Sequence, residues 1–362
     1  MRPGARDRRG TPSTSHRAAS LALALVSVCL CGTVTVAQPL FESDETLSIV
    51  LEAPFTDLLR QASKKPTVSG TLRFQQADGT DVALDVDIST RGKSRLEQCS
   101  FPPLSVNLKR QQVESTVFAR QNKLKLVTQC SHKSVYRRYL NQEYAIYRVY
   151  NLLSDHSFRV RMLDVSYRDS NGRRQDKLQP AFFIESDKSA ARRLQMQTIE
   201  ADTVKLSQLQ PQSLSILALF QFLIGNHEFS VRKGPYEEVF CHNGKLIGPA
   251  DSDGGWVVLP YDFDQAGLIN TKYSAPSDVL PIRSVRQRLY RGYCFNNDHL
   301  DATISLFNEN RAGIEALFKS GPDGGGQNKS ALKYLRSFYD IVNDPKKRQK
   351  KIIANCLSKK RR

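Results

Sequence analysis

Apolar and polar residues alternate in several short segments between residues 47 and 128, which is the pattern of half-buried β-strands. Segments 70–75 and 82–89 flank Asp78-Gly79, a dipeptide that favours a tight turn, so they predict a β-hairpin. The same alternation predicts three more strands, at 47–51, 104–108 and 124–127, and segment 55–62 is expected to be a short helix. The chain up to about residue 128 is therefore expected to be mostly β.

Helical spacing begins after this β-rich region. Apolar and aromatic residues recur every three or four positions from Val135 to Leu153, which predicts one long helix. The apolar segment 213–224 predicts a second helix that ends at Gly225, because glycine commonly follows the last residue of a helix. Further helices are expected at 298–318 and 330–342, a glycine-rich loop at 321–326, and strands at 159–167, 181–184, 239–246 and 256–261.

These elements predict an α+β fold in two parts. The first part, 38–185, is rich in β-structure and carries the long helix 135–153, and the second part, 186–345, is mainly helical. A basic tail, 346–362, follows. The chain is long enough for two lobes or for one large domain.

The N-terminal segment has the layout of a secretory signal peptide. Five arginines and one aspartate precede an apolar run from Ala18 to Val36, and the small residues Thr35 and Ala37 stand at positions −3 and −1 of a cleavage site. We expect residues 1–37 to be removed and the chain to be exported to the periplasm or beyond the cell. The alternative is an uncleaved membrane anchor, although the run is near the lower length limit for a membrane span. No later segment is long enough, so the cleaved protein is not expected to be transmembrane.

The charge of the chain favours anionic partners. The full sequence carries a net charge of +17, and removal of five bases and one acid with residues 1–37 leaves +13. The tail from Lys346 to Arg362 contains nine lysines and arginines and no acid. Two interpretations stay open for it: a site for an anionic component of the cell envelope, or a solvated end. No nucleic acid is expected as a partner.

Five cysteines remain after the predicted cleavage, and an exported protein meets an oxidising compartment in which they pair. Cys99 and Cys130 flank two neighbouring strands and are predicted to form one disulfide. Cys294 and Cys356 bracket the C-terminal helices and are predicted to form a second. Cys241 is left free. No spacing typical of a structural zinc site is present.

Three short acidic or polar segments of the second half are candidates for chemistry. Glu228 follows the apolar helix, Asn243 lies on the next strand, and Asp262 and Asp264 follow another apolar strand with their side chains on one side. Such oxygen ligands can hold Mg²⁺ and place a base nearby. The alternative is that the two aspartates only cap the strand by binding backbone amides.

Basic residues on the predicted strands complete the set of candidates. Lys109, Lys123 and Lys125 alternate with apolar residues, so one of them can contact phosphate, or all can form the solvated face of strands. Glu143 lies on the long helix and is either part of a site or a surface acid paired with an arginine. A strand lysine, a helix glutamate, a loop acid, an asparagine and an Asp-Phe motif follow one another as in protein-kinase-like phosphoryl transfer.

More closely, the chain resembles the CotH family of atypical, spore-coat-type kinases. The resemblance covers about residues 82–270, and it rests on the shared order of motifs that are each weak alone. The matching segments are Arg91-Gly92-Lys93-Ser94, Phe101-Pro102-Pro103-Leu104 leading to Lys109, Arg137-Arg138, Phe183-Ile184-Glu185, Asn226-His227-Glu228 and Tyr261-Asp262-Phe263-Asp264.

The resemblance implies a bilobal, protein-kinase-like fold that binds ATP or another nucleotide with Mg²⁺ and transfers phosphoryl to a protein. Glu228 would be the base, although the family has Asp there, and Asn243, Asp262 and Asp264 would hold the metal. Nucleotide binding falls to the remaining candidates, of which Lys125 is the foremost phosphate contact: Lys125, Lys109, Arg91, Glu143 and Glu185. The competing hypothesis is a non-catalytic protein of the cell envelope that binds an acidic partner.

Overall fold

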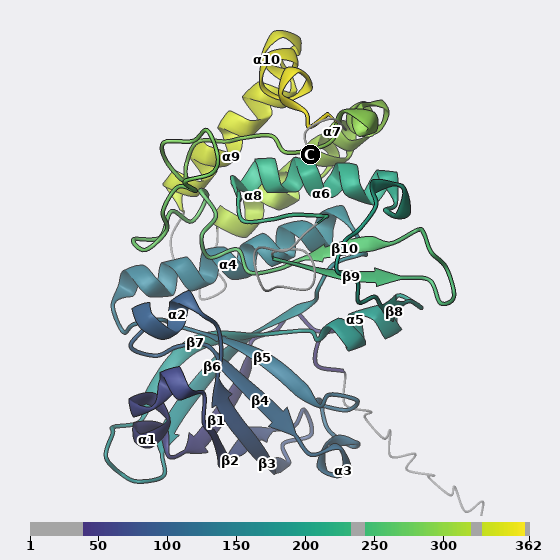
Figure 1. The fold of residues 1–362 in the computed structure, drawn as a ribbon. Coiled ribbons are helices and arrows are strands. Elements are labelled where there is room, and N and C mark those ends of the chain that lie inside the picture. The colour runs from purple at the N-terminus through teal and green to yellow at the C-terminus, as the bar shows by residue number, and fades with distance from the viewer. Residues whose placement is uncertain (1–38, 233–242, 320–327, 359–362) are drawn as a thin grey trace, which may run out of the picture. The chain divides into compact units, whose positions relative to one another are not determined.

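Seven strands of the first half form a closed barrel in the computed structural model, which describes residues 39–232, 243–319 and 328–358 (Figure 1). Around the barrel the strands follow the order β1-β2-β3-β4-β5-β7-β6. Six neighbouring pairs are antiparallel, and the parallel pairing of β1 with β6 closes the barrel. The strands are β1 (Leu47–Ala53), β2 (Thr67–Gln75), β3 (Asp81–Thr90), β4 (Leu104–Leu108), β5 (Lys123–Thr128), β6 (Val160–Asp169) and β7 (Lys177–Ile184).

Alternate residues of all seven strands fill the barrel. On β4, for example, Leu104, Val106 and Leu108 all belong to this core. The hairpin predicted around Asp78-Gly79 is confirmed as β2 and β3, and Gly79 has a φ of 84° in the turn. The period of two in the sequence therefore reports correctly which side of each strand is buried.

The prediction of a bilobal, protein-kinase-like fold is wrong. The first half closes on itself as a seven-stranded mixed barrel, and the helices lie mostly outside that barrel (Figure 1). The hydrophobic pattern predicts strands but not their partners, and the closing pair joins Leu47 to Leu163 and Ala53 to Asp169. The barrel leaves no open sheet edge, because β1 and β6 pair with each other.

The second half combines helices with a small sheet of order β10-β9-β8. Figure 1 shows α4 between the barrel and the other long helices. The sheet consists of β8 (Gln197–Thr198), β9 (Gly244–Gly248) and β10 (Val257–Pro260). The α-helices of the described residues are α1 (Phe55–Arg60), α2 (Ser94–Gln98), α3 (Arg110–Val113), α4 (Ser134–Leu153), α5 (Asp187–Arg193), α6 (Pro211–Ile224), α7 (Leu300–Glu309), α8 (Arg311–Lys319), α9 (Lys329–Val342) and α10 (Pro345–Lys351).

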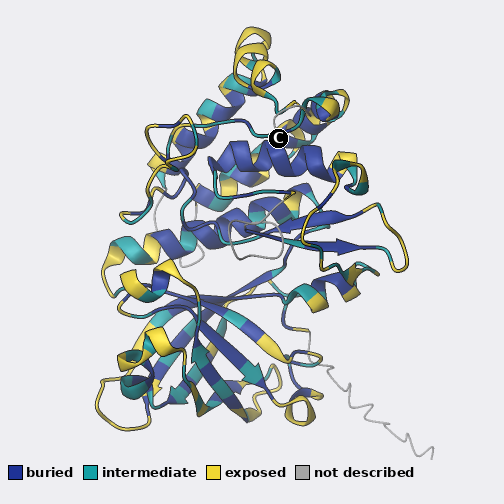
Figure 2. Ribbon diagram, in the orientation of Figure 1, coloured by how far each residue is buried: buried dark blue, intermediate teal, exposed yellow. Residues whose placement is uncertain are grey.

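Helix α6 is buried along its whole length after the first two residues (Figure 2). It ends where predicted, at Gly225, whose φ of 65° lies in the left-handed region. A Cβ atom at Gly225 would lie 2.0 Å from Tyr334 Oη, so close packing as well as backbone conformation requires glycine there. The long helix predicted at 298–318 is in fact two helices, because Asn310 ends α7 and its side chain donates to the carbonyl of Leu306 (2.9 Å).

One hydrophobic core joins α4 to the helices of the second half. Tyr147 of α4, Phe220 of α6 and Phe338 of α9 belong to it together with Phe182 of β7. The core therefore extends across the predicted boundary at residue 185. In the ranges that the structure describes, no helix is long and apolar enough to cross a membrane.

Both predicted disulfides are confirmed. Cys99 pairs with Cys130, and Cys294 pairs with Cys356. The first bond fixes the start of β4 to the end of β5, and the second fixes the chain after α10 to the segment before α7. Cys241, the first residues of the strand predicted at 239–246, the loop at 321–326 and the signal peptide lie outside the described residues.

Candidate functional site

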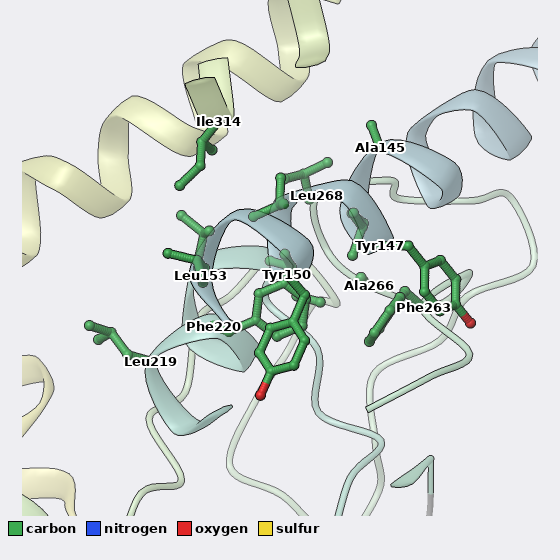
Figure 3. Close-up of a cluster of buried hydrophobic side chains, with 14 of the residues drawn as sticks. Ala145, Tyr147, Tyr150, Leu153, Leu219, Phe220, Phe263, Ala266, Leu268 and Ile314 are labelled. Atoms are coloured by element: carbon green, nitrogen blue, oxygen red, sulfur yellow. The ribbon is translucent and has the colours of Figure 1, made fainter. Parts of the chain in front are cut away.

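The segment after β10 is held in place by one buried ring. Phe263 has no exposed surface and packs between Tyr147 of α4 (ring centroids 4.7 Å apart) and Phe220 of α6 (5.5 Å), as Figure 3 shows. The N–H of Asp262 donates to Tyr147 Oη (3.0 Å). These contacts fix the two aspartates on either side of Phe263.

Asp262 and Asp264 converge on one cation, Arg95 of α2. Arg95 Nε donates to Asp264 Oδ2 (2.8 Å), and its Nη2 lies 3.9 Å from Asp262 Oδ1. The sequence suggested that strand alternation places the two aspartates on one side. Alternation is not the cause, because Asp262 has a φ of 63° and its backbone is not extended. A left-handed conformation is uncommon for an aspartate and is maintained here by the packing of its neighbours.

Glu143 of α4 is the third acid around Arg95. Its Oε2 accepts from Arg95 Nη2 (2.6 Å), and both side chains are buried. Burial raises the pKa of Glu143 to about 7, although the charge of Arg95 opposes this shift. Glu143 is therefore paired with an arginine, as one interpretation held, but inside the protein and not on its surface.

Arg95 is the central residue that the sequence analysis missed. Burial opposes its charge, but the carboxylates of Asp264 and Glu143 raise its pKa well above the usual value. It is buried, and it lies directly after the Arg91-Gly92-Lys93-Ser94 motif. The feature of the sequence that could have pointed to Arg95 is its place one position beyond that motif. The helix that carries it has five residues.

Glu228 and Asn243 lie near the backbone of Asp262. Asn243 Nδ2 is 3.4 Å from both Glu228 Oε2 and the carbonyl oxygen of Asp262. Gln265 Nε2 donates to Glu228 Oε1 (3.2 Å), and Asn243 has a φ of 51°. The predicted loop acid, asparagine and aspartate thus meet in space. Two of these three residues have a left-handed backbone, a feature that clusters at functional sites.

Asp262 is the accessible carboxylate of the group. Its side chain keeps 48% of its surface exposed, whereas the side chain of Asp264 keeps 8%. The surrounding protein and the charge of Asp264 raise the pKa of Asp262, while Arg95 and Arg91 oppose the shift. Asp262 can therefore meet a ligand, and Asp264 serves to hold Arg95.

Lys125 of β5 and Arg91 supply positive charge beside Asp262. Burial, together with the charge of Arg91, lowers the pKa of Lys125 to about 8. The Lys125 ammonium lies 5.1 Å from the ring centroid of Tyr261 and 5.8 Å from that of Phe158. A lysine with a lowered pKa gains most from an anionic ligand, because such a ligand restores its charged form.

Two predicted ligand contacts are placed differently. Lys109 is exposed beyond the end of β4 and lies 3.5 Å from Asp85, whereas Lys125 pairs with Ser105 at the start of β4. Glu185 is buried and accepts from Arg193 through both oxygens (3.0 and 2.8 Å) and from the N–H of Arg159 (3.1 Å). Lys109 thus does not join the cluster, and Glu185 holds the ends of β6 and β7 together.

Within the described residues, no set of three His, Cys, Asp or Glu side chains is arranged to hold a metal ion. Asp264 is occupied by Arg95, which leaves oxygens of Asp262 and Asn243 for a cation. Mg²⁺ in phosphate sites commonly takes only one or two carboxylates and completes its shell with phosphate oxygens and water. These residues therefore fit a cation that arrives with a phosphate better than a cation bound by protein alone.

Comparison with models of protein families and with curated proteins found no match to this chain.

Proposed function

We propose that the protein binds a nucleotide or a related phosphate ligand together with Mg²⁺, at the cluster around Asp262. The observation that carries the proposal is that the accessible carboxylate of Asp262 directly follows Tyr261, whose ring centroid lies 5.1 Å from the ammonium of Lys125. Both groups have perturbed pKa values, and such groups cluster at functional sites. The kinship with the CotH family belongs to this proposal and rests on the sequence motifs, not on the fold.

Each residue has a definite part in this proposal. Asp262 and Asn243 would contact the cation, and Lys125 and Arg91 would neutralise the phosphate oxygens. Arg95 is a positioning residue, since its hydrogen bonds to Asp264 and Glu143 hold the segment that carries Asp262. Glu143 and Asp264 therefore act through Arg95 and do not touch the ligand.

Phosphoryl transfer to a protein is the further step that we include in the proposal. Asn243 Nδ2 lies 3.4 Å from both Glu228 Oε2 and the carbonyl oxygen of Asp262, and Glu228 would take the proton of the attacking hydroxyl. Glu228→Gln should then spare ligand binding and abolish transfer, because a base stabilises the transition state more than the bound ligand. Glu228→Asp moves the carboxylate by one methylene and separates a weakened enzyme from a binding protein. In an enzyme the rate of phosphoryl transfer should change, whereas a binding protein has no such rate to change.

Calorimetry on the chain from residue 38 onward tests the binding proposal. ATP or ADP with Mg²⁺ should give a heat of binding, and Mg²⁺ alone should give none. Asp262→Asn should remove binding, whereas Asp85→Asn, an exposed acid beside Lys109, should not. Lys125→Ala should weaken binding by about tenfold or more, the value of a hydrogen bond to a charged group, and Lys109→Ala should leave it unchanged. No heat with any nucleotide, with Mg²⁺ or Mn²⁺, overturns the proposal.

A second candidate function, attachment to an anionic surface, is favoured by the basic C-terminal region. Helix α10 contributes five lysines and arginines, buries none of its residues, and stands out as an exposed helix in Figure 2. Ile352 directly after it is fully buried, and the Cys294–Cys356 disulfide fixes the chain beyond. The described part of the tail is thus a basic surface attached firmly to the core, and not a frayed end.

Charge removal tests this surface without disturbing the buried Ile352. Replacing the four lysines of α10 with glutamine should lower binding to vesicles that contain anionic lipid, and the difference should shrink as salt rises, because exposed charges are screened beyond about 10 Å at 0.1 M salt. Unchanged binding at low salt contradicts the idea. The matched control replaces four exposed lysines of the barrel region: Lys64, Lys65, Lys109 and Lys123.

Export of the protein is also part of the proposed function. The described part of the chain contains two disulfides, and disulfides persist mainly in oxidising compartments outside the cytosol. Mass spectrometry of the secreted protein should find its N-terminus at Gln38. A chain that keeps residues 1–37 contradicts cleavage.

A further inference from the structure

A second potential site lies away from the Asp262 cluster, on the barrel. It is a cavity of about 240 Å³ between α1, the end of β6 and the start of β7. Among the residues that line it are three aromatic rings and three charged side chains: Phe55, Phe101, Tyr167, Asp169, Arg174 and Lys177.

The wall of the cavity is aromatic. The ring centroids of Phe101 and Tyr167 lie 4.6 Å apart, and Phe55 lies 5.6 Å from Tyr167 and 5.8 Å from Phe101. These three rings contact one another, which gives the cavity a continuous apolar side suited to a flat, apolar group.

One polar atom in this wall lacks a partner. The hydroxyl of Tyr167 is buried and makes no hydrogen bond with any described residue. Burial raises the pKa of Tyr167, so the phenol is neutral and keeps its proton. Because this oxygen has essentially no accessible surface, a ligand in the cavity meets the ring of Tyr167 and not its hydroxyl.

The charged residues select the sign of that group. Asp169 is already engaged: its oxygens accept from Thr56 N (3.1 Å), Thr56 Oγ1 (2.8 Å) and Arg173 N (3.0 Å). Arg174 and Lys177 are exposed, and in the described part of the chain neither forms an ion pair. Arg174 interacts electrostatically with Asp169, so the lining carries two cations against one carboxylate, and this net positive charge favours an anion.

The cavity is also held in shape. The Cys99–Cys130 disulfide fixes the segment that carries Phe101, whose N–H donates to the carbonyl of Cys130 (3.1 Å). Thr128 Oγ1 donates to the carbonyl of Phe101 (3.0 Å). A preformed wall lowers the entropic cost of binding.

We propose that this cavity binds a small monocarboxylate with a single flat ring. The ring lies against Phe101 and Tyr167, and Arg174 and Lys177 bind the carboxylate. The volume of 240 Å³ is below the usual range of drug-sized pockets, which limits the ligand to one ring. This inference does not depend on the proposed function at Asp262.

Benzoate and its neutral analogue benzamide are the probes, with fluorinated versions followed by ¹⁹F NMR on the full mature chain. Benzoate should bind and benzamide should bind at least about tenfold more weakly, because it lacks the charge that the two cations contact. Arg174→Ala with Lys177→Ala should weaken benzoate binding by a similar factor. Lys333→Ala, an exposed lysine on α9, is the matched control and should leave binding unchanged.

Absence of benzoate binding up to about 10 mM, the weakest affinity expected for a ligand of this size, overturns the proposal. Equal binding of benzamide, or unchanged binding by the double variant, overturns it as well.

Discussion

Replacing Arg95 with methionine tests the buried pairing that positions the candidate site. The change keeps an unbranched chain of similar length and removes the charge and both hydrogen bonds, at 2.8 Å to Asp264 and 2.6 Å to Glu143. The two carboxylates then share a buried space without a cation. Breaking a buried ion pair from one side costs about 3–5 kcal/mol in the free energy of unfolding.

Part of this cost depends on pH, because Glu143 can bind a proton. The pKa of Glu143 is already raised to about 7, and loss of Arg95 raises it further. At pH 5 the acid is neutral in the variant, and the penalty is smaller. At pH 8 Glu143 is ionised in the wild type, and loss of Arg95 leaves that charge buried without its partner. The full cost of about 3–5 kcal/mol in the free energy of unfolding is then expected.

Urea unfolding followed by tryptophan fluorescence measures the effect. Trp256 is the only tryptophan, is 8% exposed, and donates from Nε1 to the carbonyl of Ser252 (3.0 Å) just before β10, so it reports on the strand that leads to Asp262. Arg60→Met is the matched control: its ion pair with Asp57 is as short, 2.7 Å, but exposed, and its loss should cost roughly 1 kcal/mol or less.

The double variant Arg95→Met with Glu143→Gln decides whether the two residues act as a pair. Removing the unpaired acid as well should recover about 1–3 kcal/mol relative to the sum of the single changes. A cost below about 1 kcal/mol for Arg95→Met, or strict additivity in the double variant, would refute the reasoning.

Three further predictions concern single groups. Because the pKa of Glu143 is raised in the folded state, that state binds more protons than the unfolded state between about pH 4.5 and 7. The free energy of unfolding therefore falls as pH rises, by at most about 1.4 kcal/mol per pH unit. Glu143→Gln should flatten that slope in unfolding curves, and an unchanged slope contradicts the assignment. The rate at which an amine-modifying reagent labels Lys125 should rise with pH around a midpoint of about 8, and the phosphate ligand should protect the residue, as peptide mapping will show; a midpoint above about pH 10 contradicts its lowered pKa. Gly225→Ala should lower the free energy of unfolding by roughly 1–3 kcal/mol more than Gly172→Ala, because both have a φ of 65° but only Gly225 is packed against another residue; equal losses contradict the steric argument.

The local periodicity of the sequence determined most of the secondary structure. The strand predicted at 104–108 is β4, the helix predicted at 135–153 is α4 with one more residue, and the helix before Gly225 ends at that glycine. These features depend on neighbours two to four positions apart, where burial of one side imposes a period on the residues. The cysteines were also paired correctly, because both pairs bracket elements that the pattern had already placed.

Tertiary structure alone decided how these elements associate. The parallel pairing of β1 with β6 closes the barrel and replaces the expected two-lobed fold, and no local pattern records which strands are partners. The same holds for the candidate site. The acids were recognised by residue type, but Arg95 meets Asp264 across 169 positions of sequence, and the burial of that pair exists only in the folded chain. Burial turns an ordinary arginine into the centre of a charge cluster, because the strength of each charge interaction depends on how completely water is removed from it.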